Sequence, residues 1–441
     1  MRSGGQMTMN EIERLLTFTK EAVSPFHTVE AAGKLLEEKG FSPLSWKEEW
    51  SLNPGGKYYL VHHGSALFAF TIGKDAKKEQ EIRMAAAHGD FPGFRIKPDP
   101  DMKAEAYIKL NTEPYGGVNL ASWLDRPLSA AGRVAVRGKD AFHPEMLLVD
   151  FEKPVLTIPN IAIHLDREMN KGRELNRQTQ MLPLAAMGTG AEEKGFFKKY
   201  LAKKLDVAEE DILEYEMNIY NADPGELIGF EEEFVSGPRL DDLNGVLAIL
   251  ECHCDGERTG GINSGIVVDH GEIGSSTKQG AGSTLLLLLL ERIVTALGWD
   301  RMELLRMLED TMLLSVDVAH GVHPNYQEKA DPTNHPVLNG GFCIKEASSQ
   351  SYATDSEAIA IVQALCEEEK IPYQKFVNRS DGTGGGTLGA IASALVPVRT
   401  IDIGVPLLAM PSSRELMGKK DMKALTSFFR SFFSADLWQM R

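Results

Sequence analysis

The chain has 441 residues, of which 43% are hydrophobic and 25% are charged, enough for two or more domains with buried cores. Its 47 basic and 63 acidic side chains give a net charge of −16, which argues against nucleic acid or an anionic membrane as a partner because both repel an acidic surface. The longest apolar run, 285–290, is too short to span a bilayer, residues 1–10 show no secretory signal pattern, and four cysteines are too few for a disulfide framework, so we expect a cytoplasmic protein.

The first ninety residues combine helical and extended patterns. Apolar residues recur at helical spacing over 9–40, with a break at Pro25 that predicts two helices. Residues 58–72 predict a pair of strands, and 82–87 predict a buried strand that leads directly to His88.

From about residue 93 to 234 the pattern changes to short strand-like pieces between turn signals. One helical segment is expected near 195–205, and a polar linker around 170–180. We therefore predict a β-rich inserted domain over 93–234 that builds a dimer or oligomer interface. A simple subdomain that packs on its own chain is the alternative.

From residue 235 onward, strands and helices alternate. Helices are expected over 243–252, from a cap at Ser283, over 355–369 and over 387–394, with strands over 264–268, 313–318 and 398–403. This alternation predicts an α/β fold, a three-layer α/β/α catalytic domain with a central, mostly parallel sheet, formed by 1–92 and 235–441. Functional residues then belong at the carboxyl ends of the strands.

Four fragments place a histidine or a carboxylate at the end of an apolar run. They are AHGD (87–90), RLDD (239–242), DHGEIG (269–274) and SVDVAH (315–320). Scattered His, Asp and Glu ligands of this kind hold the Lewis acid and the low-pKa water of zinc hydrolases. The segment CHC (252–254) is a second possible metal clip, but we interpret it as the end of a buried helix because cysteine is among the most buried residue types.

Further motifs lie along nearly the whole chain. They are SPFHTV (24–29), HGDFPG (88–93), YGG (115–117), WLDRPL (123–128), GRV (132–134), IPNIAIHL (158–165), IGS (273–275), HPNY (323–326), RSD (379–381) and RE (414–415). In these motifs the chain resembles the aspartyl aminopeptidase and aminopeptidase I family of di-zinc exopeptidases, which cleave N-terminal residues from peptides.

The resemblance implies a role for each ligand position. His88 and Asp317 match two ligands of one zinc ion, and Asp241 matches the carboxylate that bridges both ions. Glu272 matches a ligand of the other ion. Asp90 matches the carboxylate that orients His88, as metal-bound imidazoles usually require.

The resemblance also implies substrate contacts and an assembly. His320 and Lys345 fall where the family contacts substrate, and Lys345 suits an acidic side chain. His164 matches a residue that reaches into a neighbouring subunit's site. The family implies a homo-oligomer of up to twelve subunits, in which the inserted domain makes contacts between subunits.

The chain departs from the family at the site itself. The family has two adjacent glutamates where this chain has Gly271-Glu272, and the first of them is the general base, worth about 10²–10⁴-fold in rate. The family has a metal-binding histidine where this chain has Pro411, whose ring offers no donor atom. Gly89 and Phe91 replace small hydroxyl residues. His270 is a further candidate ligand, although neighbouring strand residues point to opposite faces.

These departures leave the triplet His88, Asp241 and Asp317 intact, so we expect one metal site to persist and the other to be weakened. The sequence thus predicts a metalloaminopeptidase with impaired catalysis. The alternative is an inactive pseudoenzyme, an oligomeric scaffold that binds peptides or partners. A deacetylase or amidohydrolase is disfavoured because the motifs along the whole chain belong to the aminopeptidase family. The metal ligands suit zinc, cobalt or manganese.

Overall fold

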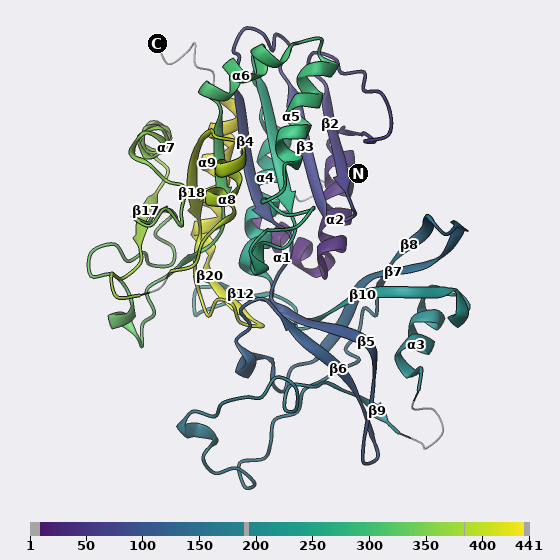
Figure 1. Cartoon of the computed structure of the whole chain (residues 1–441). Helices are drawn as coiled ribbons and strands as arrows, with labels where there is room; N and C mark the ends of the chain where they lie inside the picture. The colour runs from purple at the N-terminus through teal and green to yellow at the C-terminus, as the bar shows by residue number, and fades with distance from the viewer. Residues whose placement is uncertain (1–8, 189–193, 383, 436–441) are drawn as a thin grey trace, which may run out of the picture.

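The computed structural model describes residues 9–188, 194–382 and 384–435, which form a nine-stranded, a six-stranded and a five-stranded sheet (Figure 1). The expected absence of a secretory signal concerns residues that mostly lie outside these ranges. No helix in the described part of the chain is long and apolar enough to cross a membrane.

The nine-stranded sheet is the centre of the molecule. Its spatial order is β1 (Ser42–Pro43), β2 (Lys57–His62), β3 (Ala66–Ile72), β13 (Ile262–Val268), β4 (Ile82–His88), β14 (Met312–Val316), β18 (Arg399–Gly404), β16 (Phe342–Glu346) and β17 (Tyr373–Val377). Five of its eight neighbouring pairs are parallel, which confirms the mostly parallel sheet. Strands β4, β13 and β14 are buried along their whole length, as expected of strands covered on both faces.

Helices cover both faces of this sheet, so the three-layer α/β/α prediction is confirmed (Figure 1). One face carries α1 (Glu11–Glu21), α2 (Pro25–Glu38), α4 (Leu240–Asp255), α7 (Ser356–Glu369) and α9 (Lys419–Ser434). The other carries α5 (Leu285–Ala296), α6 (Arg301–Asp310) and α8 (Leu388–Leu395). Each face has its own hydrophobic core, which fixes the sheet as a rigid platform.

Sequence signals explain several helix ends. Asn10 caps α1 in a capping box with Glu13, and Ser24 caps α2 ahead of Pro25. The expected cap at Ser283 lies two residues before α5, where its hydroxyl accepts a hydrogen bond from the main-chain N–H of Leu285 (3.3 Å).

The segment CHC (252–254) lies inside α4, as interpreted. The Nε2 atom of His253 is hydrogen-bonded to the main-chain carbonyl oxygen of Asn263 (3.1 Å).

The six-stranded sheet is entirely antiparallel. Its order is β8 (His143–Asp150), β7 (Leu128–Asp140), β10 (Ile212–Asn221), β5 (Gly93–Ala104), β6 (Tyr107–Tyr115) and β9 (Leu184–Met187), with α3 (Phe196–Leu205) packed against it. The chain leaves this sheet at Asn221, before the expected boundary at residue 234.

The five-stranded sheet lies between the other two (Figure 1). It consists of β11 (Glu226–Ile228), β12 (Phe234–Gly237), β20 (Glu415–Gly418), β19 (Pro406–Leu408) and β15 (Ala319–His320). Short 3-10 helices span η1 (Leu120–Trp123), η2 (Met169–Lys171), η3 (Glu209–Asp211), η4 (Gly271–Ile273) and η5 (Gln327–Lys329).

Candidate metal centre

The predicted ligands lie at one edge of the central sheet. His88 ends β4, and the register pairs it with Val268, the last residue of the parallel strand β13. Asp317 follows β14 directly, on the other side of β4. Because parallel strands end at the same edge, the loops that follow them meet there, as the rule for α/β sheets predicts.

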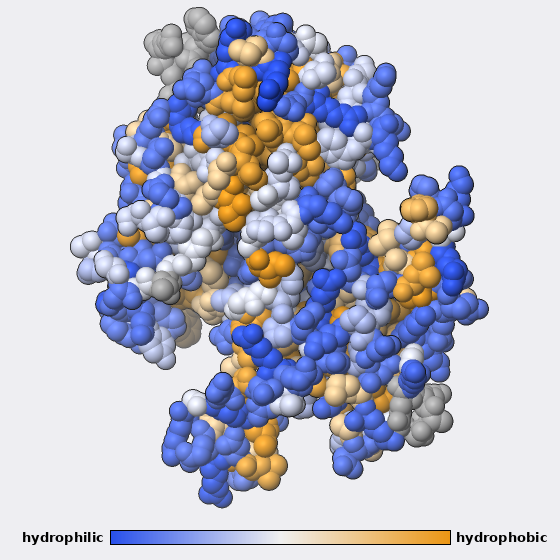
Figure 2. Space-filling model, in the orientation of Figure 1, coloured by the Kyte–Doolittle hydropathy of each residue, from blue (hydrophilic) through white to orange (hydrophobic). Residues whose placement is uncertain are grey.

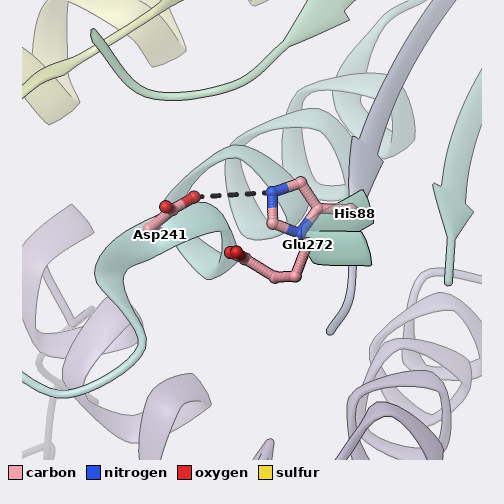
Figure 3. Close-up of side chains that lie close together, drawn as sticks. All are labelled: His88, Asp241 and Glu272. Atoms are coloured by element: carbon pink, nitrogen blue, oxygen red, sulfur yellow. Dashed lines mark ion pairs between the residues drawn. The ribbon is translucent and has the colours of Figure 1, made fainter. Parts of the chain in front are cut away.

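The ligand atoms converge (Figure 3). The Nε2 atom of His88 lies 3.4 Å from Asp241 Oδ1 and 3.9 Å from Asp317 Oδ1. One ligand atom each from His88, Asp241 and Glu272 lie within 4.8 Å of one another, and Figure 3 shows the Glu272 carboxylate directed at the other two side chains. The structure thus brings all four residues together from four separate segments.

A second group of ligand atoms consists of Asp241, Asp242 and Asp317, also within 4.8 Å of one another. Sequence reasoning did not assign Asp242, although it adjoins Asp241. Its side chain is fully buried, and its Oδ2 accepts a hydrogen bond from the main-chain N–H of His88 (3.3 Å). Asp242 therefore helps to fix the strand end that carries His88.

The electrostatics of this centre fit a bound cation. Within the described part of the chain, the buried atoms Asp241 Oδ1 and Asp242 Oδ1 have no hydrogen-bond partner. Burial raises the pKa of Glu272 well above its ordinary value, and the charges of Asp241 and Asp90 raise it further. Orphaned carboxylate oxygens beside an imidazole nitrogen are the donor set of a zinc site, and a divalent ion would offset their mutual repulsion.

Asp90 lies where it was expected, beside the ring of His88. The Nδ1 atom of that ring lies 2.9 Å from the Asp90 carbonyl oxygen and 3.3 Å from its Oδ1. The Asp90 carboxylate also accepts hydrogen bonds from the main-chain N–H groups of Gly271 (2.8 Å) and Glu272 (3.1 Å) and from the Tyr115 hydroxyl (2.7 Å). One buried carboxylate thus fixes both the histidine and the loop opposite it.

Gly271 lies directly against His88. A Cβ atom at this position would be 2.5 Å from the Cβ and Cγ atoms of His88, far inside van der Waals contact. In this conformation the loop therefore has no room for a side chain at position 271, where the resemblance implies a general base. His270 belongs to neither group of ligand atoms found among the described residues, and its Nδ1 atom lies 2.8 Å from the Thr277 hydroxyl.

Pro411 lies on the turn between β19 and β20, facing the inserted segment. Its carbonyl accepts a hydrogen bond from the main-chain N–H of Asn119 (3.1 Å). A Cβ atom at Gly117 would be 3.8 Å from its ring. Among the described residues, the contacts of Pro411 are thus packing and main-chain contacts, at a position where the resemblance implies a histidine ligand.

The expected substrate-contacting residues lie in three different environments. His320 is exposed and lines a cavity of about 310 Å³ together with Lys329, Arg379 and Met410. Lys345 is only 2% exposed, and its Nζ donates to the carbonyl of Val318 (2.9 Å), beneath the Asp317 turn.

His164 lies in an exposed loop of the inserted segment. The substrate roles of these residues stay predictions.

Comparison with known proteins gives a consistent picture. The family model of the aminopeptidase I zinc metalloprotease (M18) matches residues 18–433. The "Probable M18 family aminopeptidase 2" of Clostridium novyi (strain NT) is 45% identical over 422 residues, which are 95% of this chain and 98% of that protein.

Two solved structures are similar throughout. A chain of the Ape4 and Nbr1 complex superposes with a TM-score of 0.91 at 32% identity, covering 95% of this chain and 84% of that chain. The S. cerevisiae mApe1 dodecamer gives a TM-score of 0.83 at 27% identity, covering 96% and 95%. The chain with this buried cluster of imidazole and carboxylate donors therefore belongs to the M18 family of zinc aminopeptidases.

Proposed function

We propose that this chain is a metal-dependent aminopeptidase of the aspartyl aminopeptidase type, which removes N-terminal residues from peptides at a reduced rate. The observation that carries the proposal is the convergence of His88, Asp241, Glu272 and Asp317 at one sheet edge. Zinc bound there supplies a Lewis acid for the scissile carbonyl and lowers the pKa of the attacking water.

One zinc ion per subunit is the expected occupancy. His88, Asp241 and Asp317 would hold it, because the Oδ1 atoms of the two aspartates lie 3.4 Å and 3.9 Å from the Nε2 atom of His88. Pro411 offers no atom to a second ion, so the site that Glu272 and Asp241 share lacks one protein ligand. Zinc is the cofactor of the family, and the second site is weakened.

The reduced rate follows from the missing base at Gly271. Glu272 is the best-placed substitute, since its carboxylate lies beside His88 and Asp241 and its main chain is fixed by Asp90. Burial and neighbouring carboxylates raise the pKa of Glu272 in the metal-free chain, and the charge of a bound zinc ion would lower it again, so this role requires the metal. In this proposal, Glu272 accepts a proton from water as the water oxygen bonds to the scissile carbon. It then returns the proton to the amine nitrogen as the C–N bond breaks.

A catalytically inactive scaffold is the second candidate, and a specific observation favours it. The contact between Gly271 and His88 leaves no space for the usual base, and Pro411 offers no side-chain donor to a metal ion. Two such changes are what a chain retained for peptide or partner binding would accumulate.

We further propose that the chain acts as a homo-oligomer in the cytoplasm. The mApe1 neighbour is a dodecamer. The inserted sheet exposes large apolar side chains, among them Phe142, Met146 and Met187, and Figure 2 shows apolar patches on that part of the surface. All four cysteines are free and buried, as is usual in a reducing compartment.

Metal content and peptide turnover test the proposal together. We expect one zinc ion per subunit and slow, zinc-dependent release of the chromophore from aminoacyl anilides whose amino acid is acidic or neutral. Asp317→Asn should abolish both, whereas Asp255→Asn, at a surface ion pair with Lys39, should leave both unchanged. Stoichiometric zinc without any release above the background rate would refute the peptidase and support the scaffold.

A further inference from the structure

The motif YGG (115–117) is the point where the inserted sheet reaches the metal centre. It follows β6, whose last residue, Tyr115, donates its hydroxyl to Asp90 Oδ2 at 2.7 Å. Gly116 turns with φ +77, and a Cβ atom there would lie 3.2 Å from Glu272 Cβ. This motif belongs neither to the predicted zinc ligands nor to the predicted substrate contacts.

Asp90, the acceptor of that bond, is completely buried. Its carboxylate has four polar neighbours: the Tyr115 hydroxyl, the ring of His88, and the main-chain N–H groups of Gly271 and Glu272.

Tyr115 contacts Asp90, and Asp90 in turn contacts the metal ligand His88, so Tyr115 lies one residue further from the metal centre than Asp90. A carboxylate that keeps all its hydrogen bonds has one fixed orientation, whereas a buried carboxylate that loses one can rotate or must take up another partner. Rotation of Asp90 would move the acceptor of His88 Nδ1 and the anchor of the loop that carries Glu272. Groups that orient metal-bound histidines in this way typically contribute 10- to 100-fold in metal affinity or activity.

We propose that Tyr115 is a positioning residue of the metal centre: its hydroxyl fixes Asp90, which fixes His88 and the loop of Glu272. The inserted sheet therefore completes the metal centre of its own chain, in addition to any contact with other subunits. This inference rests on the proposed zinc-dependent function.

Zinc affinity of the full-length Tyr115→Phe variant is the direct test. The matched control is Tyr59→Phe, which also removes a hydroxyl that donates to a carboxylate, Glu37 Oε1 at 2.6 Å, on helix α2. We expect a zinc dissociation constant raised about 10- to 100-fold for Tyr115→Phe and changed less than about twofold for Tyr59→Phe. A role only in holding the insert in place would lower the thermal stability of the zinc-free chain without this difference in affinity.

A double-mutant cycle with Asp90→Asn adds a second readout. If Tyr115 acts through Asp90, its substitution should change zinc affinity little once Asp90 is altered. Native affinity in Tyr115→Phe, or a full additional effect in the Asp90→Asn background, would overturn the inference. If Asp90→Asn does not fold, the comparison with Tyr59→Phe decides. Failure of the unaltered chain to bind zinc would instead refute the proposed function.

Discussion

The contact between Gly271 and His88 gives the sharpest quantitative test of the metal centre. In Gly271→Ala, the new methyl carbon would lie 2.5 Å from His88 Cβ and Cγ and 2.9 Å from Cδ2. Carbon atoms in contact are separated by about 3.5–4.0 Å, so the ring or the loop must move by about 1 Å. Overpacking of this kind costs about 1–3 kcal/mol, and Asp90 restrains the loop, so we expect the His88 ring to take much of the displacement.

Two measurements separate the parts of this effect. The free energy of unfolding of the zinc-free chain should fall by about 1–3 kcal/mol, and zinc should bind about tenfold more weakly because its histidine ligand has moved. The control is Gly33→Ala in helix α2, where the new methyl group would meet Tyr59 at an ordinary 3.7 Å. That change should stabilise the chain by up to about 1 kcal/mol, since alanine is the better helix former. If Gly271→Ala leaves both stability and zinc affinity unchanged, the loop accommodates a side chain and the reasoning is wrong.

Three further predictions concern the charges of the centre. Removal of zinc should lower the unfolding midpoint by an amount that grows with pH. In the zinc-free chain, the raised pKa of Glu272 contributes stability that is fully present below about pH 4.5, the usual pKa of a glutamate, and is lost as pH rises through the folded-state pKa. Zinc, in contrast, binds more tightly as the carboxylates ionise. Glu272→Gln should lower kcat by about 10²–10⁴-fold with zinc affinity changed less than tenfold; loss of the zinc itself would show that Glu272 is a ligand and not the base. Lys345→Met should lower the unfolding free energy by about 1–3 kcal/mol, because the buried carbonyl of Val318 would lose its hydrogen-bond donor and the carboxylate of Asp317 would lose a nearby positive charge. A change only in KM for acidic N-terminal residues would instead support the predicted substrate contact of Lys345.

The sequence predicted the elements that have a clear period and a length of at least one full strand or helix. The run 82–87 gave β4 and placed His88 at its end, and the alternation after residue 235 predicted the parallel sheet. The five-stranded sheet was not predicted. Its strands have two to four residues, too few for a period, and β12 pairs with β20, which lies far away in the sequence.

The ligand residues were predicted from the family resemblance, because a single histidine or carboxylate at the end of an apolar run is weak evidence for a metal site. The contact of Asp90 with His88 was expected from the same resemblance, but the contacts of Tyr115 and Asp242 were not, because they join distant segments whose relative placement no local pattern determines. Tyr115 reaches Asp90 only because β5 and β6 pair antiparallel and return the chain to the edge where β4 ends. Asp242 looked like a neighbour of Asp241 at a helix start, where an aspartate is usually a cap.

Restoring the general base at position 271 and the histidine at position 411 separates what the sequence predicts from what the structure predicts. From the sequence alone, Gly271→Glu with Pro411→His should return the base and the missing ligand, and activity should appear if those are the only defects. In the structure, the Cβ atom of a glutamate at 271 meets His88 at 2.5 Å, so the change that supplies the base also displaces a ligand of the intact site. We therefore expect Pro411→His alone to increase the zinc content, and the double change to recover less than about tenfold of the 10²–10⁴-fold that a general base contributes. Recovery of a hundredfold or more, measured as kcat on aminoacyl anilides, would show that the loop moves at little cost and that glycine at 271 removed only a proton acceptor, not the space for one.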